Sequence, residues 1–311
     1  MNLVVSRAVS REIIMSRKTS RTTVVSILVL VFALSGPLLA QEEDKEAELG
    51  MSNSTELSFV LTEGNSNTDA LGFKNRFRYL WPSSRYTFRV EATRTNTTDD
   101  RIAVVRDDLV PGYEIIEFSK SPDVEKYLVE NRYDREITER FFWNVGLSWD
   151  RNLDAGIISR WIGFAGVGNI WWDRKDLSFN TSYGLSYTDR EEEDVDPTKE
   201  ERFPGYRFNW EYLNKWGKNT TFENRWTFNG NFSDSADWNS DMTSSISVGI
   251  NSRLALMVSL QWLFNNRPAI EDLDLFIETP EGDLIQVPDG IVQDPKRKLD
   301  TIFNTSLVIN F

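Results

Sequence analysis

The fold is decided by the stretch Phe141-Phe142-Trp143-Asn144-Val145-Gly146-Leu147-Ser148-Trp149. Its apolar residues at odd-numbered positions alternate with Phe142, Asn144, Gly146 and Ser148. Successive side chains of a β-strand point to opposite sides, so a two-residue period of apolar residues marks a strand with one apolar face. The stretch therefore predicts a β-strand whose second face is largely polar.

The same period recurs along the chain and predicts twelve strands. They cover residues 56–62, 71–81, 85–94, 126–134, 141–149, 158–171, 177–187, 206–213, 220–229, 238–250, 254–264 and 303–311. The stretch 158–171, with Gly163, Gly166 and Gly168, has no clear phase. Several strands reach about 10 residues, which is the length that crosses a bilayer when tilted. A soluble β-sandwich is the alternative, but its strands are usually about 5–6 residues long.

The lengths of the connections alternate with strand number. Short connections follow the second, fourth, sixth, eighth and tenth strands, whereas long ones occupy residues 95–125, 188–205 and 265–297. This alternation is typical of a membrane barrel with tight turns at one end and longer loops at the other. A sheet in lipid cannot leave the hydrogen-bonding groups of its edge strands unpaired. We therefore expect an all-β fold over residues 52–311: a closed antiparallel transmembrane β-barrel of about 12 strands with up-and-down topology.

Residues 1–40 have the organisation of a secretory signal peptide. Five Arg and Lys residues precede an uncharged apolar run, Val24 to Leu34, and the small residue Ala40 precedes Gln41. A short membrane anchor is the alternative, although the run is shorter than the ~20 residues that a spanning helix needs. Residues 41–51 are acidic and predict a flexible periplasmic lead-in.

Composition excludes several classes of function. The 311 residues include no Cys and no His, and their formal net charge is −13. Disulfides, thiolate metal sites and the usual nucleophile–base pairs are therefore absent, and the acidic balance argues against binding nucleic acid. A hydrolase built on Glu211 and Glu223 remains chemically possible, but nothing singles out this pair. We expect no enzyme activity, no cofactor and no metal site.

Three motifs resemble known bacterial proteins. The ending Leu307-Val308-Ile309-Asn310-Phe311 resembles the last strand of outer-membrane proteins, whose terminal aromatic residue is read by the barrel-assembly machinery. Residues 57–68, Arg132-Tyr133-Asp134 and Gly166-Val167-Gly168 resemble an uncharacterised family often described as salt-induced outer-membrane proteins; Asn169 departs from its pattern. The resemblance implies a barrel without an established ligand, located in the bacterial outer membrane. Outer-membrane lipids, lipopolysaccharide and the assembly machinery would be its partners, and we expect a monomer.

Charged residues on the non-apolar faces are the candidate site. If the apolar faces meet lipid, eight cations and seven acids point into the barrel. The cations are Lys74, Arg76, Arg78, Arg85, Arg89, Arg132, Arg207 and Arg225, and the acids are Glu91, Glu130, Asp134, Asp150, Glu211, Glu223 and Asp300. One hypothesis is a pore lining whose opposing rows orient a polar or ionic solute. The other is an interlocked ion-pair network that fills a narrow lumen.

One basic group and two acidic groups of residues each allow two interpretations. The basic residues of 74–89 would either attract anions or meet Glu211 and Glu223 from the opposite wall. The acidic residues of 189–201 and 271–294 would either bind divalent cations, including those that bridge lipopolysaccharide, or form solvated loops. We expect a narrow channel for small polar solutes or ions. The alternative is a structural or salt- and stress-related envelope barrel with a side-chain-filled lumen.

Overall fold

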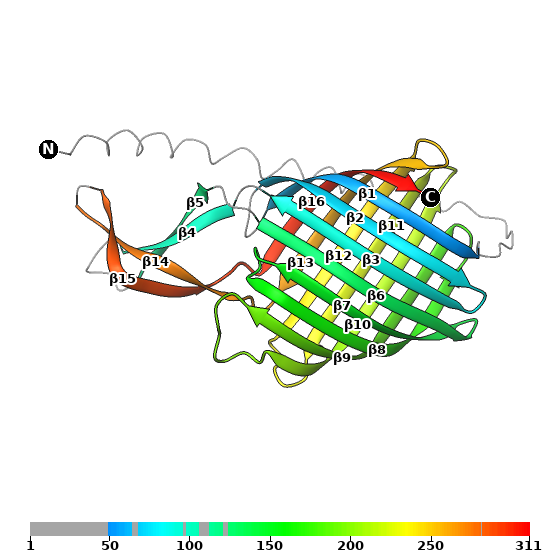
Figure 1. Cartoon of the computed structure of the whole chain (residues 1–311), viewed down its shortest axis with the longest axis horizontal. Helices are drawn as coiled ribbons and strands as arrows, with labels where there is room; N and C mark the ends of the chain where they lie inside the picture. The colour runs from blue at the N-terminus through cyan, green and yellow to red at the C-terminus, as the bar shows by residue number, and fades with distance from the viewer. Residues whose placement is uncertain (1–48, 64–67, 96–97, 106–111, 121–123, 281) are drawn as a thin grey trace.

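The computed structural model describes residues 49–63, 68–95, 98–105, 112–120, 124–280 and 282–311, and these form sixteen strands. Twelve strands close into a barrel in the order β1-β16-β13-β12-β11-β10-β9-β8-β7-β6-β3-β2, and every neighbouring pair is antiparallel (Figure 1). The barrel strands are β1 (Gly50–Glu63), β2 (Thr68–Trp81), β3 (Ser84–Thr95), β6 (Val124–Thr138), β7 (Phe141–Asn152), β8 (Ile157–Asp173), β9 (Leu177–Glu192), β10 (Arg202–Trp216), β11 (Thr220–Asn231), β12 (Trp238–Gly249), β13 (Leu254–Asn265) and β16 (Leu299–Asn310). The predicted fold class is confirmed, because each of the twelve predicted stretches forms one of these strands.

The barrel closes where its first strand meets its last. β1 pairs with β16 from Ser54 opposite Asn310 to Glu63 opposite Thr301. The backbone of Phe311 extends this pairing: its N–H donates to the carbonyl of Asn53 at 2.9 Å and its carbonyl accepts from the N–H of Asn53 at 3.3 Å. Closure satisfies the backbone groups that an open sheet would leave exposed at its edges.

The two ends of the barrel differ in their connections. At one end, the short-turn end, residues 82–83, 139–140, 174–176, 217–219 and 250–253 join neighbouring strands, and β1 begins and β16 ends there. At the other end, the long-connection end, residues 193–201 join β9 to β10 and residues 232–237 join β11 to β12. The predicted long connections after the third, seventh and eleventh barrel strands all lie at this end, although residues 153–156, which join β7 to β8 here, are no longer than the turn 250–253. The predicted signal peptide, and all of the lead-in up to residue 48, lie outside the described residues.

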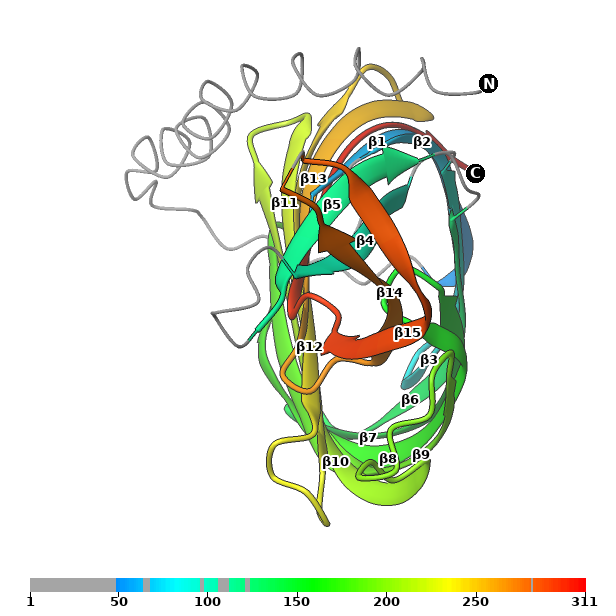
Figure 2. The ribbon, with the colours of Figure 1, turned by 90° about the vertical axis from the view of Figure 1, so that its left-hand side faces the viewer.

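Two of the predicted long connections, 95–125 and 265–297, contain strands, so the expectation of a solvated loop at 271–294 is wrong. β4 (Thr98–Val105), β5 (Glu114–Lys120), β14 (Ile270–Glu278) and β15 (Leu284–Pro295) form a second sheet in the order β15-β14-β4-β5. It projects beyond the long-connection end (Figure 1) and lies in front of part of the opening when the barrel is viewed end-on (Figure 2).

The second sheet is held by a parallel contact between distant segments. β14 runs beside β4, with Leu275 opposite Ala103, and Val104 and Leu273 are buried. No local hairpin signal announces a parallel pairing between segments this far apart in sequence. The carboxylates between the apolar residues of these strands also hid the strands in the sequence. The described residues contain no helix, and hence none long and apolar enough to cross a membrane.

The barrel wall is apolar on its outside and polar on its inside. On β7, Asn144 and Ser148 are 3% and 4% exposed, whereas Val145 and Leu147 are 44% and 45% exposed. The same inversion occurs on β9, where Ser182 is buried and Leu185 is exposed. A water-soluble protein buries its apolar side chains and exposes its polar ones. The alternation in the sequence is thus confirmed, with the apolar face pointing outward.

Candidate functional site

Fourteen charged residues meet in the middle of the lumen, and we call them the central charge cluster. They are Lys74, Arg76, Arg78, Arg85, Arg89, Arg132, Arg207 and Arg225, with Glu56, Glu91, Glu130, Asp134, Glu211 and Glu223. β1, β2, β3 and β6 carry most of them on one wall, and β10 and β11 carry the rest on another. Each is placed inward by the two-residue alternation of its strand, which turns the neighbouring apolar side chains outward.

Ion pairs of this cluster join walls that are distant in the ring of strands. Arg76 on β2 contacts Glu223 on β11 at 3.0 Å, and four strands separate β2 from β11 on the shorter way round the ring. Arg85 on β3 contacts Glu211 on β10 at 3.3 Å, again with four strands between. Since neither pair lies on adjacent strands, both cross the lumen.

A third crossing lies closer to the long-connection end. Arg207 on β10 contacts Glu130 on β6 at 3.0 Å, with three strands between. The guanidinium of Arg207 also lies over the ring of Phe164, with 4.2 Å from Cζ to the ring centroid. The predicted meeting of the basic residues with Glu211 and Glu223 from the opposite wall is therefore present in the structure.

Most carboxylates of the cluster are shared between two cations. Asp134 contacts Arg85 at 3.0 Å and Arg132 at 2.7 Å. Glu130 contacts Arg89 as well as Arg207, and Glu91 contacts Lys74 and Arg89 at 3.7 Å each. Such sharing is the interlocked arrangement that charge-assisted hydrogen bonds favour when ions leave water. It narrows the lumen at this level.

A cavity of about 130 Å³ opens on the side of the cluster that faces the long-connection end. Arg89, Glu130 and Arg207 of the cluster line its inner part. Its wall is mixed: the buried polar side chains of Ser148, Asn152 and Gln261 line it together with the buried apolar side chains of Ile157 and Ile162. With roughly 10–15 Å³ needed per water molecule, the cavity has room for on the order of ten waters or for one small solute.

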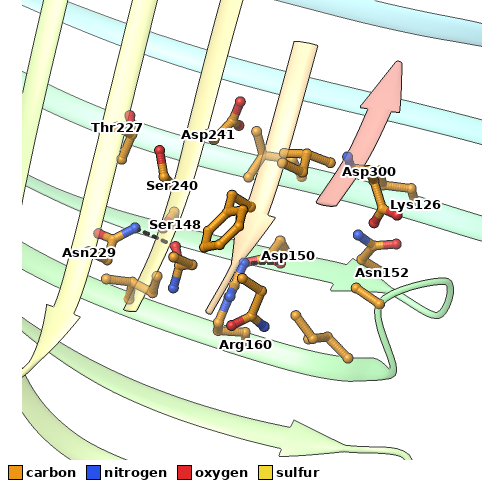
Figure 3. A pocket seen from close by; sticks show the side chains of 18 of the residues that line it. Lys126, Ser148, Asp150, Asn152, Arg160, Thr227, Asn229, Ser240, Asp241 and Asp300 are labelled. Atoms are coloured by element: carbon orange, nitrogen blue, oxygen red, sulfur yellow. Dashed lines mark hydrogen bonds and ion pairs between the residues drawn. The ribbon is translucent and has the colours of Figure 1, made fainter. Parts of the chain in front are cut away.

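The wall of the cavity includes charged residues that sequence reasoning missed (Figure 3). Arg160 donates to both oxygens of Asp150 at 3.0 Å, and Asp241 accepts from the amide of Gln261 at 2.8 Å. The ammonium of Lys126 is buried and has no hydrogen-bond partner among the described residues. Lys126 shares the phase of Glu130, so the alternation of β6 could have found it. Arg160 was hidden because the glycines of β8 blur the phase of that strand.

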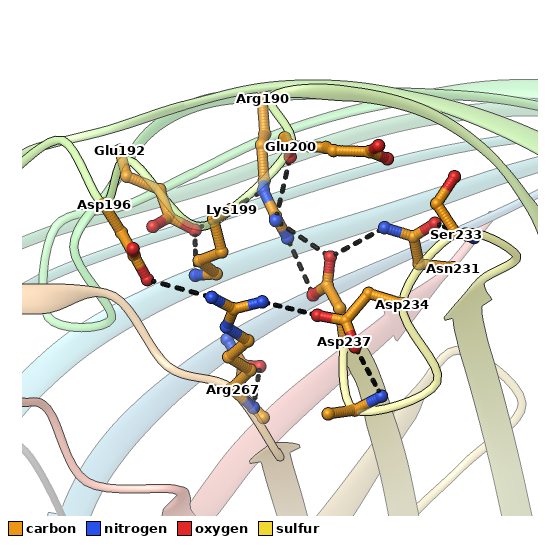
Figure 4. Close-up of polar contacts among 12 residues, drawn as sticks. Arg190, Glu192, Asp196, Lys199, Glu200, Asn231, Ser233, Asp234, Asp237 and Arg267 are labelled. Carbon is orange, nitrogen blue, oxygen red and sulfur yellow. Dashed lines mark hydrogen bonds and ion pairs between the residues drawn. The ribbon is translucent and has the colours of Figure 1, made fainter.

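Loops at the long-connection end are held together by a second group of ion pairs (Figure 4). Arg190 donates to both oxygens of Asp237 at 2.9 Å, and both side chains are less than 10% exposed. Lys199 contacts Glu192 at 2.5 Å. Arg267, between β13 and β14, contacts Asp234 of the β11–β12 connection and Asp196 of the β9–β10 connection. Three connections are thereby linked at one mouth of the barrel.

Two carboxylates of these loops have lowered pKa values. The pKa of Asp234 is lowered by the N–H of Ala236, which donates to it, and by Arg267. Burial acts to raise the pKa of Asp196, but hydrogen bonds from Thr198 and the charge of Arg267 outweigh it, so this pKa is also lowered. In the described part of the chain, no group of three or more acidic residues is arranged to hold a metal ion.

Phe311 lies at the short-turn end with its side chain 73% exposed. Its backbone pairs with β1, whereas its ring is free to contact whatever surrounds the barrel. The backbone of Phe311 therefore contributes to barrel closure, and its exposed ring is available for a contact outside the barrel.

Comparisons with known proteins identify one family and several similar barrels. Residues 55–274 match the model of the family described as "Protein of unknown function, DUF481". A search of curated protein sequences finds no match. The NanC porin aligns with 11% identity and a TM-score of 0.48, covering 82% of this chain and 98% of the porin. The toluene transporter TodX of Pseudomonas putida aligns with 8% identity and a TM-score of 0.36, covering 85% of this chain and 90% of the transporter. OmpT of Vibrio cholerae aligns with 7% identity and a TM-score of 0.37, covering 84% of this chain and 96% of OmpT.

Proposed function

The chain belongs to the family described as "Protein of unknown function, DUF481", and we propose that this member is a bacterial outer-membrane barrel with a narrow channel for small polar solutes or ions. The observation that carries the proposal is the inverted wall: large apolar side chains cover the outside, while buried polar and charged side chains point inward and line much of a cavity. An apolar exterior is stable in lipid, and a polar interior is stable only if it holds water, ions or paired charges.

Two groups of aromatic side chains support a membrane location. Near the short-turn end, Trp216 stacks on Phe222 with centroids 5.6 Å apart. Toward the long-connection end, Tyr206 contacts Phe232 at 5.5 Å and Phe228 stacks on Trp238 at 5.2 Å. Ten residues of β10 separate Trp216 from Tyr206. They span ~34 Å along the strand and ~25 Å along the axis at a tilt of about 45°, which is the height of the apolar band of such barrels.

The remaining features of the proposal follow from this location. We propose export through a cleaved signal peptide, assembly of a monomer by the barrel-assembly machinery, and contact with lipopolysaccharide at the long-connection end. Fractionation of cells tests the location, and the first residue of the mature protein tests cleavage. The expected results are outer-membrane recovery and an N-terminus at Gln41; recovery in the soluble fraction would contradict the proposal.

Conductance across a planar lipid bilayer tests the channel. A channel predicts stable unitary current steps from the purified protein. The paired change Arg76→Ala with Glu223→Ala removes one crossing without leaving an unpaired charge, and we expect it to raise the unitary conductance. The matched control is Arg160→Ala with Asp150→Ala, which removes a pair along the cavity wall. Absence of steps at all voltages for the natural protein would contradict the channel.

A second candidate function is favoured by the crossings themselves. Four ion pairs of the central charge cluster cross the lumen and fill this part of the barrel, so a structural or salt-stress-related envelope barrel without transport is the alternative. Under this alternative the natural protein is silent in bilayers, and a deletion strain grows poorly at high salt or with detergent. Both candidates are proposed without catalysis, and the ion pairs of Glu211 and Glu223 with arginines support a structural role for these two carboxylates.

A further inference from the structure

We propose that the central charge cluster is an anion site, and that Arg78 and Arg225 make the channel select small anions over cations. This inference rests on the proposed channel and names the class of solute that it admits. The class comprises small inorganic oxyanions and chloride, together with organic carboxylates or phosphates small enough for the cavity.

The charge of the cluster is opposite in sign to that of the chain. Its eight cations face six carboxylates, which leaves an excess of two positive charges within the cluster. The chain as a whole carries −13. A positive lumen in an acidic protein is therefore a local arrangement and does not follow from average composition.

The excess resides in two identifiable side chains. Arg78 follows Arg76 by two residues on β2, and Arg225 follows Glu223 by two residues on β11, so both share the inward phase of the Arg76–Glu223 crossing. Among the described residues, neither Arg78 nor Arg225 has a carboxylate within ion-pair distance, although the other six cations of the cluster do. The Nε of Arg78 is buried and has no hydrogen-bond partner there.

The carboxylates nearby are already engaged. Glu223 is held by Arg76, and Glu211 is shared by Arg85 and Arg132. Glu211 stands opposite Arg225 in the register of β10 and β11, yet its oxygens contact the arginines of the other wall. Arg78 and Arg225 therefore face the lumen from opposite walls, and neither contacts a carboxylate of the described residues.

Arginine cannot relieve this situation by losing its proton, because its guanidinium stays charged at any pH that proteins experience. A partly buried charge without a partner is costly, and a mobile counter-ion removes that cost. The forked guanidinium binds two oxygens at once, so oxyanions and carboxylates suit it better than a cation or neutral solute does. Two such groups on facing walls attract an anion from the cavity and repel cations from the same level.

The sign of selectivity is measured from the reversal potential across a planar bilayer with a KCl gradient. We expect a chloride-to-potassium permeability ratio above 1 for the natural protein. In Arg78→Gln/Arg225→Gln the ratio is expected to fall about fivefold or more, because removing charges a few ångströms from the permeating ion changes its energy substantially. Glutamine keeps much of the side-chain volume, so the change tests charge more than size.

The matched control is Arg140→Gln/Arg202→Gln. It removes the same total charge from two exposed positions, one at each end of the barrel. Its ratio is expected to stay close to that of the natural protein. A natural ratio below 1, or an equal ratio in both double variants, would overturn the anion site while leaving the channel intact.

A second measurement separates failure of the anion site from failure of the channel. Sodium sulfate replaces sodium chloride at constant ionic strength, because the forked guanidinium is expected to hold an oxyanion more tightly than chloride. The protein is heated in detergent at each sulfate concentration, and the folded barrel is followed by its gel mobility. We expect sulfate to raise the unfolding temperature of the natural protein and of the control variant more than that of Arg78→Gln/Arg225→Gln. A protein that is silent in bilayers but shows this difference has the site without the channel. Equal sulfate effects in all three proteins would overturn the site.

Discussion

At the scale of single residues, the lumen is shaped by glycines as well as by charges. The ring of Phe164 on β8 lies over Gly146 of β7, so closely that an added Cβ at residue 146 would stand 2.3 Å from Cζ of Phe164 and 2.6 Å from the carbonyl oxygen of Asn131. The same ring supports the guanidinium of Arg207, which crosses to Glu130. Because Gly146 has no side chain, the ring of Phe164 has room to lie beneath Arg207 and support its ion pair with Glu130.

Gly146→Ala is therefore expected to destabilise the barrel by about 1–3 kcal/mol, the usual cost of overpacking a filled interior. Backbone as well as side chain blocks the added methyl group, so a rotamer change of Phe164 relieves only part of the clash. Urea unfolding in lipid vesicles, followed by tryptophan fluorescence, measures the cost. The control is Gly163→Ala on β8, where nothing lies within 4 Å of the added Cβ. Equal stability of the two variants would contradict the proposed packing.

At the scale of elements, three connections act as one unit at the long-connection end. Arg267 contacts Asp196 and Asp234, and it also donates to Thr198. The buried Arg190–Asp237 pair lies beside this group and links β9 to the β11–β12 connection. These contacts involve residues more than thirty positions apart, so they stabilise the arrangement of the loops and not their local conformation.

The depressed pKa values of Asp196 and Asp234 predict how this unit depends on pH. A carboxylate whose folded pKa lies below its unfolded value stabilises the fold above the unfolded pKa, and this contribution is lost as the pH falls through the folded pKa. The ordinary value is 3.8 for both. Urea unfolding of the natural protein and of Arg267→Met is expected to show a stability difference that is constant above about pH 5 and shrinks at lower pH. A difference that grows on acidification would contradict the assignment.

The four-stranded sheet is an appendage of the barrel at the same scale. β14 and β15 are inserted between β13 and β16, and β4 and β5 between β3 and β6, while β13 pairs directly with β16 and β3 with β6. The barrel hydrogen bonds therefore do not depend on the sheet.

Replacing residues 98–120 and 270–295 together by short Gly-Ser linkers is expected to leave the barrel folded. We expect the faster gel mobility of the unboiled protein to persist, and the extrapolated free energy of unfolding to change by no more than about 10–15%, the uncertainty of such extrapolations. Replacing only residues 270–295 is the comparison, because it leaves β4 without its parallel partner. Loss of the mobility difference in the double replacement would show that the sheet is needed for closure.

At the scale of the whole molecule, closure and membrane assembly meet at Phe311. Its backbone completes the pairing of β1 with β16, whereas its exposed ring makes no contribution to the lumen. The stability of the folded barrel and the efficiency of its assembly in the membrane are therefore separate properties. Phe311 contributes to the first through its backbone and to the second through its ring.

Phe311→Ala is expected to lower the amount of folded protein in the outer membrane severalfold, because the ring that the assembly machinery would read is lost. The same variant refolded in detergent is expected to unfold within about 0.5 kcal/mol of the natural protein, as exposed substitutions usually do. Phe311→Tyr, which keeps an aromatic ring, serves as the control. Unchanged membrane levels of Phe311→Ala would contradict the assembly signal.

The sequence by itself determined the strands of the barrel and the side on which most of the charged residues of the central charge cluster lie. Both depend on the two-residue period, which is a local property of an extended chain and can be read from neighbours such as Phe141 to Trp149. Where glycines blur the period, as on β8, the inward Arg160 was missed. Where carboxylates mask apolar residues, as on β14, the strand itself was missed.

Only the tertiary structure decided which charges meet. The pairing of Arg76 with Glu223 and of Arg85 with Glu211 depends on the order of strands around the closed ring and on their register. The parallel contact of β4 with β14 and the buried Arg190–Asp237 pair likewise join distant segments. The physical reason is that alternation fixes a direction for each side chain, whereas a contact across the lumen exists only once all twelve strands have closed. After closure, neither Arg78 nor Arg225 contacts a carboxylate of the described residues. The composition of the chain does not predict this absence of ion pairs.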